Sequence, residues 1–309
     1  MSSSPSPAAT AMDAVFEADT FQTLTLNLPE AHVTLRPHDE ADRVHVRGGI
    51  PDAAPEQAQR AFDRTNIAAR QSGDRLLVHG EGPSATVEDW RWRQRGLTAV
   101  HLLVHLPPEL AVDASLPGGS VDASGLAGVL DLTVHGGSVH TANLQGPLRI
   151  QGSGGALTVS NSSGPVALDW AGGEVTLSGT RDEVALRARA APTTLSDAQA
   201  PVDLAVHGAP LSLQDVNGPC DAMVHGASLT YRGAPQWDTT LRVAGGPLYA
   251  YLPAAHEASV SLSGSQVALD DAFEFAGTQT DGHATGTLQG GGVSLTFQAV
   301  QGLVACRAQ

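Results

Sequence analysis

The feature that most constrains this chain is a pair of small residues that recurs every 18 positions. The step holds through seven units and then slips by one residue at Gly245-Gly246. The pairs before the slip are Gly118-Gly119, Gly136-Gly137, Gly154-Gly155, Gly172-Gly173, Ala190-Ala191, Gly208-Ala209 and Gly226-Ala227. Internal repetition with a short fixed period is typical of a solenoid.

Each unit alternates between aliphatic and polar residues. Counted from the first residue of the pair, positions four, six, thirteen and fifteen are almost all aliphatic, and the residues between them are mostly polar. Position four, for example, is Val121, Val139, Leu157, Val175, Thr193, Leu211 and Leu229. Alternation with a period of two predicts strands that bury one face.

The residues between these strands predict corners. Position eight is Gly125, Asn143, Asn161, Gly179, Asp197, Asp215 and Gly233, all of types that tolerate a positive φ. Position twelve holds Pro147, Pro165, Pro201 and Pro219, which suit the start of a strand. Two strands and two corners in 18 residues predict an all-β chain in which each unit is one coil of a parallel β-helix. The pattern leaves the handedness open.

The repeat covers part of the chain, and three regions are predicted. Residues 1–14 are expected to be disordered. Residues 15–100 are expected to form a strand-rich capping region with one short helix near Glu56–Arg64 and a hairpin over 66–71 and 75–79. Residues 101–309 are expected to form the β-helix, with an irregular C-terminal cap from about residue 273.

Three stretches of sequence carry a family resemblance. They are VHLLVHLP at 100–107, Gly-x-Val and Gly-x-Leu repeats such as GVLDL at 128–132, and the tail GGGVSL at 290–295. On these the chain resembles, over roughly residues 20–309, the bacterial putative-adhesin β-strand-repeat family, a group of domains of unknown function. It is also similar to head-domain putative autotransporter adhesins. The resemblance implies a right-handed β-helix without an established activity or catalytic residue.

Composition excludes several functional classes. All 17 basic residues are Arg, so a Schiff-base enzyme or a P-loop nucleotidase, each of which needs Lys, is ruled out. The formal net charge of −15 argues against nucleic acid as a partner. Cys220 and Cys306 are expected to be reduced structural thiols. No motif for a metal, a cofactor or a nucleophile is present, so we expect no cofactor, no metal and no catalytic activity.

The sequence also sets an expectation for location. The first residues have neither positive charge nor a continuous apolar run, and no stretch reaches the ~18 apolar residues of a membrane span. We therefore expect a cytoplasmic protein with no membrane span of its own. Association with an envelope through a partner stays open.

Tyr249 and Tyr251 are the most distinctive residues at outward-facing positions, since they occupy positions five and seven of their unit. In the preceding units these positions hold mainly Thr and Ser, as in Thr158, Ser160, Thr176, Ser178, Thr194 and Ser196. The period gives the two tyrosines Thr230 and Arg232 as neighbours on one side and Ala268 and Asp270 on the other. Two adjacent Tyr on a flat polar sheet could stack on a sugar or a protein. The alternative is that they form the edge of the end cap.

Two further clusters are candidates. Trp90, Arg91, Trp92 and Arg93 combine aromatic and basic residues, either as a surface patch or as a strand that covers the end of the coil. His207 and His225 are predicted to lie ~4.8 Å apart on neighbouring strands. They are either a metal- or proton-binding pair or polar turn residues copied by duplication.

Together these features predict a non-catalytic β-solenoid that presents a flat polar surface to an unknown protein or glycan partner. One alternative is an enzyme that acts on polysaccharide, since β-helices host lyases and hydrolases. Another is a structural scaffold that self-associates through the ends of its coil.

Overall fold

The computed structural model describes residues 9–38, 42–50, 56, 59, 62–63, 65–81 and 100–309. The chain is all-β, as predicted, and it divides into two compact units, Met1–Gly155 and Ala156–Gln309, called unit 1 and unit 2 below. The region boundaries expected from the sequence stay predictions.

The described elements of unit 1 are mainly short strands. They are β1 (Ala9–Glu17), the 3-10 helix η1 (Ala18–Thr20), β2 (Thr23–Asn27), β3 (Ala31–Pro37), β4 (Arg43–Ile50), β5 (Ala68–Ser72), β6 (Arg75–His79), β7 (Val100–Leu106), β8 (Ala111–Pro117), β9 (Ser120–Ser124) and β10 (Leu130–Leu144). Strand β11 (Leu148–Ser162) begins in unit 1 and ends in unit 2.

Unit 2 continues with strands of similar length until its last part. They are β12 (Val166–Ala171), β13 (Val175–Thr180), β14 (Val184–Arg189), β15 (Thr193–Ala198), β16 (Val202–His207), β17 (Leu211–Val216), β18 (Cys220–His225), β19 (Leu229–Arg232), β20 (Thr239–Ala244), β21 (Leu248–Leu252), β22 (Ala258–Leu269), β23 (Phe275–Gln279), β24 (His283–Leu288) and β25 (Val293–Ala308).

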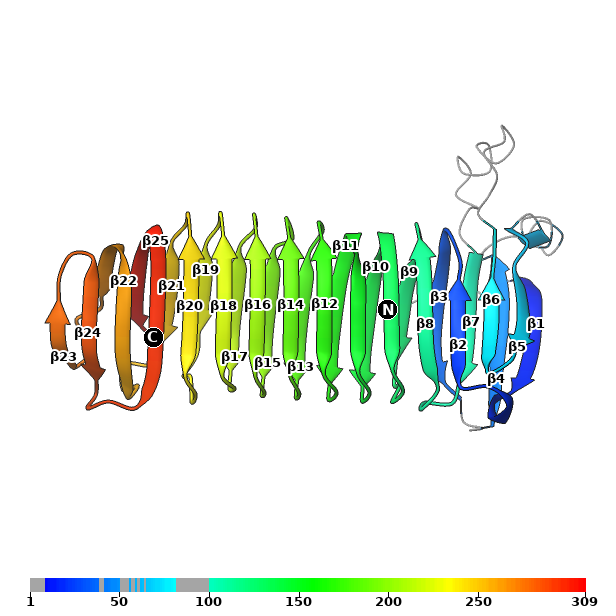
Figure 1. Cartoon of the computed structure of the whole chain (residues 1–309), viewed down its shortest axis with the longest axis horizontal. Coiled ribbons are helices and arrows are strands. Elements are labelled where there is room, and N and C mark those ends of the chain that lie inside the picture. The colour runs from blue at the N-terminus through cyan, green and yellow to red at the C-terminus, as the bar shows by residue number, and fades with distance from the viewer. Residues whose placement is uncertain are drawn as a thin grey trace, which may run out of the picture. The chain divides into compact units, whose positions relative to one another are not determined.

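Parallel strands in unit 2 pair with the register that the repeat predicts. β12, β14, β16 and β18 follow one another, so that Val166 lies beside Val184, then Val202 and then Cys220. The strands β13, β15, β17, β19 and β21 form a second series in the same way. Figure 1 shows β12, β14, β16, β18 and β20 as neighbouring arrows that point the same way. The aliphatic columns of unit 2 are buried, so the predicted core is confirmed.

Both predicted corners are present. Every residue at position eight has a positive φ, from 51° at Asp215 to 139° at Gly233. Position one is also left-handed, for example at Gly172 with φ 73° and Gly208 with φ 71°. Ala190 takes the same conformation with φ 50°, although an L-residue with a Cβ is strained there. The Gly, Asn and Asp residues of the repeat therefore mark where the chain turns between strands.

Opposite substitutions at position one of successive units are expected to have opposite effects. Ala190→Gly should raise the free energy of unfolding by about 0.5–1 kcal/mol because it relieves the strain of a positive φ. Gly208→Ala should lower the free energy of unfolding by about 1–2 kcal/mol. A Cβ added at Gly208 would meet no atom within 4 Å, so this cost is conformational rather than steric. Urea denaturation followed by circular dichroism measures both values. If both substitutions changed the free energy of unfolding in the same direction, the assignment of position one to a left-handed corner would be contradicted.

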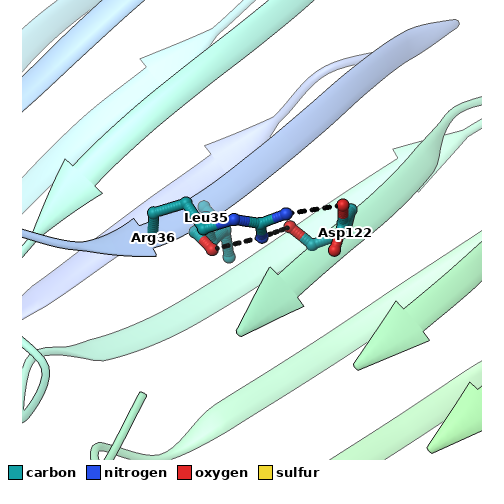
Figure 2. A network of polar contacts seen from close by, with 3 residues as sticks. All are labelled: Leu35, Arg36 and Asp122. Carbon is teal, nitrogen blue, oxygen red and sulfur yellow. Dashed lines mark hydrogen bonds and ion pairs between the residues drawn. The ribbon is translucent and has the colours of Figure 1, made fainter. Parts of the chain in front are cut away.

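Unit 1 stacks its strands out of chain order. β2 lies between β6 and β8 and pairs with both in parallel, and β3 lies between β7 and β9 in the same way. The β2–β3 pair is thus inserted between two strand pairs that follow it in sequence. Arg36 of β3 holds β9 alongside, because its guanidinium donates to the Asp122 carboxylate at 2.6 Å and to the Asp122 carbonyl at 3.0 Å (Figure 2).

The disorder predicted for residues 1–14 is wrong for residues 9–14, which lie in β1. β1 pairs antiparallel with β4, from Ala9 beside Ile50 to Glu17 beside Arg43. The polar composition of this segment suggested disorder, but the free edge of β4 offers hydrogen bonds that order it. Residues 1–8 lie outside the described residues.

One further prediction in the N-terminal part has a clear outcome, and a second lies partly outside the described residues. The hairpin is confirmed, because β5 and β6 pair antiparallel around Gly73, whose φ is 62°. Near the predicted helix, Glu56, Gln59 and Phe62 have helical backbone, while the residues between them lie outside the described part of the chain.

The end of the chain is also inserted out of order. β25 pairs in parallel with β20 and β21 on one side and with β22 on the other. Beyond β22 the pairing becomes antiparallel, first with β24 and then between β24 and β23. In unit 2 the last strand of the sequence is therefore an interior strand of the stack, and an antiparallel hairpin follows the outer side of β22.

Candidate binding face

One face of unit 2 is formed by the outward positions of the second strand series. Below it is called the hydroxyl face, and it comprises Thr158, Ser160, Thr176, Ser178, Thr194, Ser196, Ser212, Gln214, Thr230, Arg232, Tyr249, Tyr251 and Arg307. Successive members lie beside one another in register. Their side chains are half-buried or exposed, and the residues between them on each strand are buried. A row of hydroxyl groups therefore leads to an aromatic and cationic end.

The aromatic end is built from three neighbouring strands. Thr230 of β19 lies beside Tyr249 of β21, and Arg232 lies beside Tyr251. The Arg232 guanidinium carbon lies 4.0 Å from the centroid of the Tyr251 ring, a cation–π contact. Both tyrosines are half-buried, and Arg232 is exposed. Tyr251 thus fixes the direction of the guanidinium.

The neighbours predicted on the other side of the tyrosines are wrong. Ala305 lies beside Tyr249 and Arg307 lies beside Tyr251, in place of Ala268 and Asp270. The reason is the insertion of β25, since Ala268 pairs with Ala305 one strand further on. Reading the repeat in chain order therefore missed Arg307. The signal that could have found it is Gly302, which approaches Gly246 and takes the second place of the small-residue pair.

The two arginines of this end differ from other arginines of unit 2 in their contacts. Among the residues that the structure describes, no ion pair is formed by Arg232 or Arg307, whereas Arg242 lies 2.8 Å from Asp221 and Arg189 lies 3.2 Å from Asp169. Two carboxylates at nearby corners accept other hydrogen bonds. Asp215 accepts a hydrogen bond from the Gln214 amide, and Asp270 accepts hydrogen bonds from backbone N–H groups of Ala272 and Ala308.

The cysteines are poor candidates for reactive groups. Cys220 and Cys306 are free and buried. Burial raises the pKa of the Cys306 thiol to about 12. Burial, with a smaller contribution from the Asp221 carboxylate, raises the pKa of Cys220 to about 12. Both thiols stay protonated at neutral pH, so neither is a nucleophile. Within the described ranges, no three His, Cys, Asp or Glu residues gather where they could hold a metal ion.

The structure describes only one of the other two predicted clusters, the pair of histidines. Trp90, Arg91, Trp92 and Arg93 lie outside the described residues. His207 and His225 do stack, with ring centroids 4.8 Å apart and an angle of 22° between the ring planes. They belong to the first strand series, and their role stays a prediction.

A histidine cluster in unit 1 was missed by sequence reasoning. His32 of β3 lies beside His101 of β7, with ring centroids 4.8 Å apart, and His38 approaches His105 at 6.0 Å. His45 of β4 lies beside His105 and contacts the Asp13 carboxylate of β1. These histidines come from segments far apart in sequence, so only the insertion of β3 beside β7 brings them together.

The cluster predicts a pH-dependent stability for unit 1. Partial burial, then the nearby His32, lowers the pKa of His101; partial burial, then the nearby His38, lowers the pKa of His105. The unfolded chain therefore binds these protons more readily than the folded one. Stability should be full above the unfolded value of about 6.5 and should fall as the pH drops below it.

Urea denaturation at pH 7.5 and at pH 5.5 measures this dependence. The His101→Gln, His105→Gln double variant should lose less stability over that range than the natural sequence does. An unchanged slope in the variant would show that other groups cause the dependence.

No helix among the described residues has the length and apolar character needed to cross a membrane.

Comparisons with known proteins give structural neighbours only. No family model matches the sequence, and no curated protein matches it. A putative lipid binding protein of Parabacteroides distasonis is similar at 10% identity and a TM-score of 0.38, over 95% of this chain and 96% of that chain.

Two further solved structures are similar to this chain. One is a putative adhesin of Bacteroides fragilis, with 9% identity and a TM-score of 0.36 over 96% of each chain. The other is a putative cell adhesion protein of Clostridium sporogenes, with 8% identity and a TM-score of 0.23, over 96% of this chain and 99% of that chain. The structural neighbours thus include proteins described as a putative adhesin and a putative cell adhesion protein.

Proposed function

We propose that this protein is a non-catalytic binding protein built on a right-handed parallel β-helix with about 18 residues per coil. The register of 18 between parallel strands and the left-handed corners at positions one and eight support the helix. The handedness comes from the family resemblance. A stack of this kind holds outward side chains on a rigid grid, because each interior strand is hydrogen-bonded to a neighbour on both sides.

The surface proposed for binding is the end of the hydroxyl face around Tyr249 and Tyr251. The observation that carries this proposal is the register that sets these tyrosines beside Thr230 and Arg232, with a cation–π contact of 4.0 Å between Arg232 and Tyr251. Aromatic side chains give much contact area for little loss of entropy. The adjoining row of Thr and Ser hydroxyls offers hydrogen bonds to a glycan or to a protein.

The antiparallel strands of each unit favour a binding protein over a filament. In unit 1, β5 pairs antiparallel with β6 and β1 with β4; in unit 2, β23 and β24 form an antiparallel hairpin beside β22. These strands reverse the direction of the parallel ladder. A second copy could therefore not simply continue the stack in register.

A glycan array followed by calorimetry on the strongest ligand tests the proposal. Tyr249→Ala and Tyr251→Ala should each weaken binding about tenfold or more, as expected for a central aromatic contact. Thr176→Ala is the matched control, because it lies on the same face several strands away, and it should bind as the natural sequence does. Unchanged affinity in both tyrosine variants, with intact circular dichroism, would remove this surface from consideration.

A further inference from the structure

Arg232 and Arg307 bracket Tyr251. Arg232 lies on the strand on one side of Tyr251, and Arg307 lies on the strand on the other side. The backbone positions of the two arginines are therefore two strand spacings apart, roughly 9–10 Å. Both side chains are exposed. The arrangement is a short cationic row with an aromatic ring at its centre.

The two arginines of this row lie in a chain that is acidic overall. The chain has 32 acidic residues against 17 arginines, and Arg36, Arg189 and Arg242 are each matched with a carboxylate. Within the described part of the chain, Arg232 and Arg307 make no ion pair, and the contact of Arg232 is to an aromatic ring. An anionic ligand that reaches across the Tyr251 ring would be attracted by both guanidinium groups.

We infer that the ligand of this face is a short saccharide that carries a carboxylate, such as a uronic acid oligomer. This inference rests on the proposed function and specifies its ligand. The planar guanidinium matches a carboxylate through two parallel hydrogen bonds. Tyr249, whose partner in β25 is the small buried Ala305, offers a ring for a sugar. Thr230 and Ser212 continue with hydroxyls suited to sugar hydroxyls.

The overall charge favours a short ligand. A net charge of −15 repels long polyanions, so recognition has to come from local contacts and not from a broad positive field. Tyr251 serves as a positioning residue in this arrangement, since its ring holds the Arg232 guanidinium in place before the ligand arrives.

The test is calorimetry of the full chain with an oligomer of galacturonic acid and with the methyl ester of the same oligomer. The free acid should bind about tenfold or more tightly than the ester, because esterification removes the charge. Arg232→Gln and Arg307→Gln should each weaken binding of the acid about tenfold and leave binding of the ester unchanged. Arg187→Gln, at an exposed position of the first strand series, is the matched control.

A second pair of variants tests the role of Tyr251. Tyr251→Phe retains the ring and should therefore bind the acid as tightly as the natural sequence does. Tyr251→Leu lacks the ring, and its affinity for the acid should fall by the same factor as in Arg232→Gln. Equal binding of acid and ester, or no binding of either at millimolar concentration, would overturn the inference. So would a sulfated oligosaccharide that binds more tightly than the carboxylate. If the protein instead binds a neutral ligand and Tyr249→Ala abolishes that binding, the proposed function is supported and the inference of a carboxylated ligand is wrong.

Discussion

Ending the chain at Gly292 is expected to unfold the C-terminal part of unit 2. The truncation removes β25, which lies between β20 and β21 on one side and β22 on the other. Leu295, Phe297 and Val304 are fully buried, and burial of each contributes about 1.5–3 kcal/mol. Their loss approaches the whole stability of a domain, which is about 5–15 kcal/mol. The truncation also leaves two unpaired strand edges that invite aggregation.

Thermal unfolding, limited proteolysis and size-exclusion chromatography measure this effect. The truncated chain should lose protection over β20–β24 and elute in aggregates. Removal of Gln309 alone is the control, because this residue is exposed, and it should behave as the full chain does. Adding residues 290–309 as a separate peptide should restore part of the protection. A truncated chain that melts and digests like the full chain would show that β25 does not lie inside the stack.

Much of the fold could be predicted from the repeat alone. The period of 18 fixed which residues of neighbouring strands lie together, because one residue of slip would turn a buried column outward. The residue types at position eight, Gly, Asn and Asp, predicted a positive φ. β-branched and bulky residues are strained in that conformation, so their absence from this position fits. Both inferences depend on local chemistry that repeats many times, so a single exception such as Ala190 does not obscure them.

The order of the strands at each end of the chain could not be predicted. Alternation shows that β3 and β25 each bury one face, but it does not show which neighbours they pair with. The partners of β3 lie far away in sequence, as Ala31 beside Val100 and Val33 beside Val121 illustrate. The histidine cluster of unit 1 and the place of Arg307 beside Tyr251 both follow from these insertions.

Trp170→Ala is expected to lower the free energy of unfolding by about 3–5 kcal/mol, the usual cost of removing a large buried aromatic side chain. Trp170 has no exposed surface and lies beside Ala188, which is equally buried. In the next strands the same column holds Val206, Val224 and Val243. A large residue beside a small one therefore fills the volume that paired valines fill elsewhere in unit 2.

This complementarity predicts a reversal of sign in a double-mutant cycle. Ala188→Val alone should destabilise the protein by about 1–3 kcal/mol, because Trp170 already occupies the space. In the Trp170→Ala background the same change should instead recover about 1–2 kcal/mol, because it partly fills the cavity. Urea denaturation of the four proteins gives the coupling free energy. Equal effects of Ala188→Val in both backgrounds would mean that the two side chains do not share one space, and the stacking of β12 on β14 would then need another explanation.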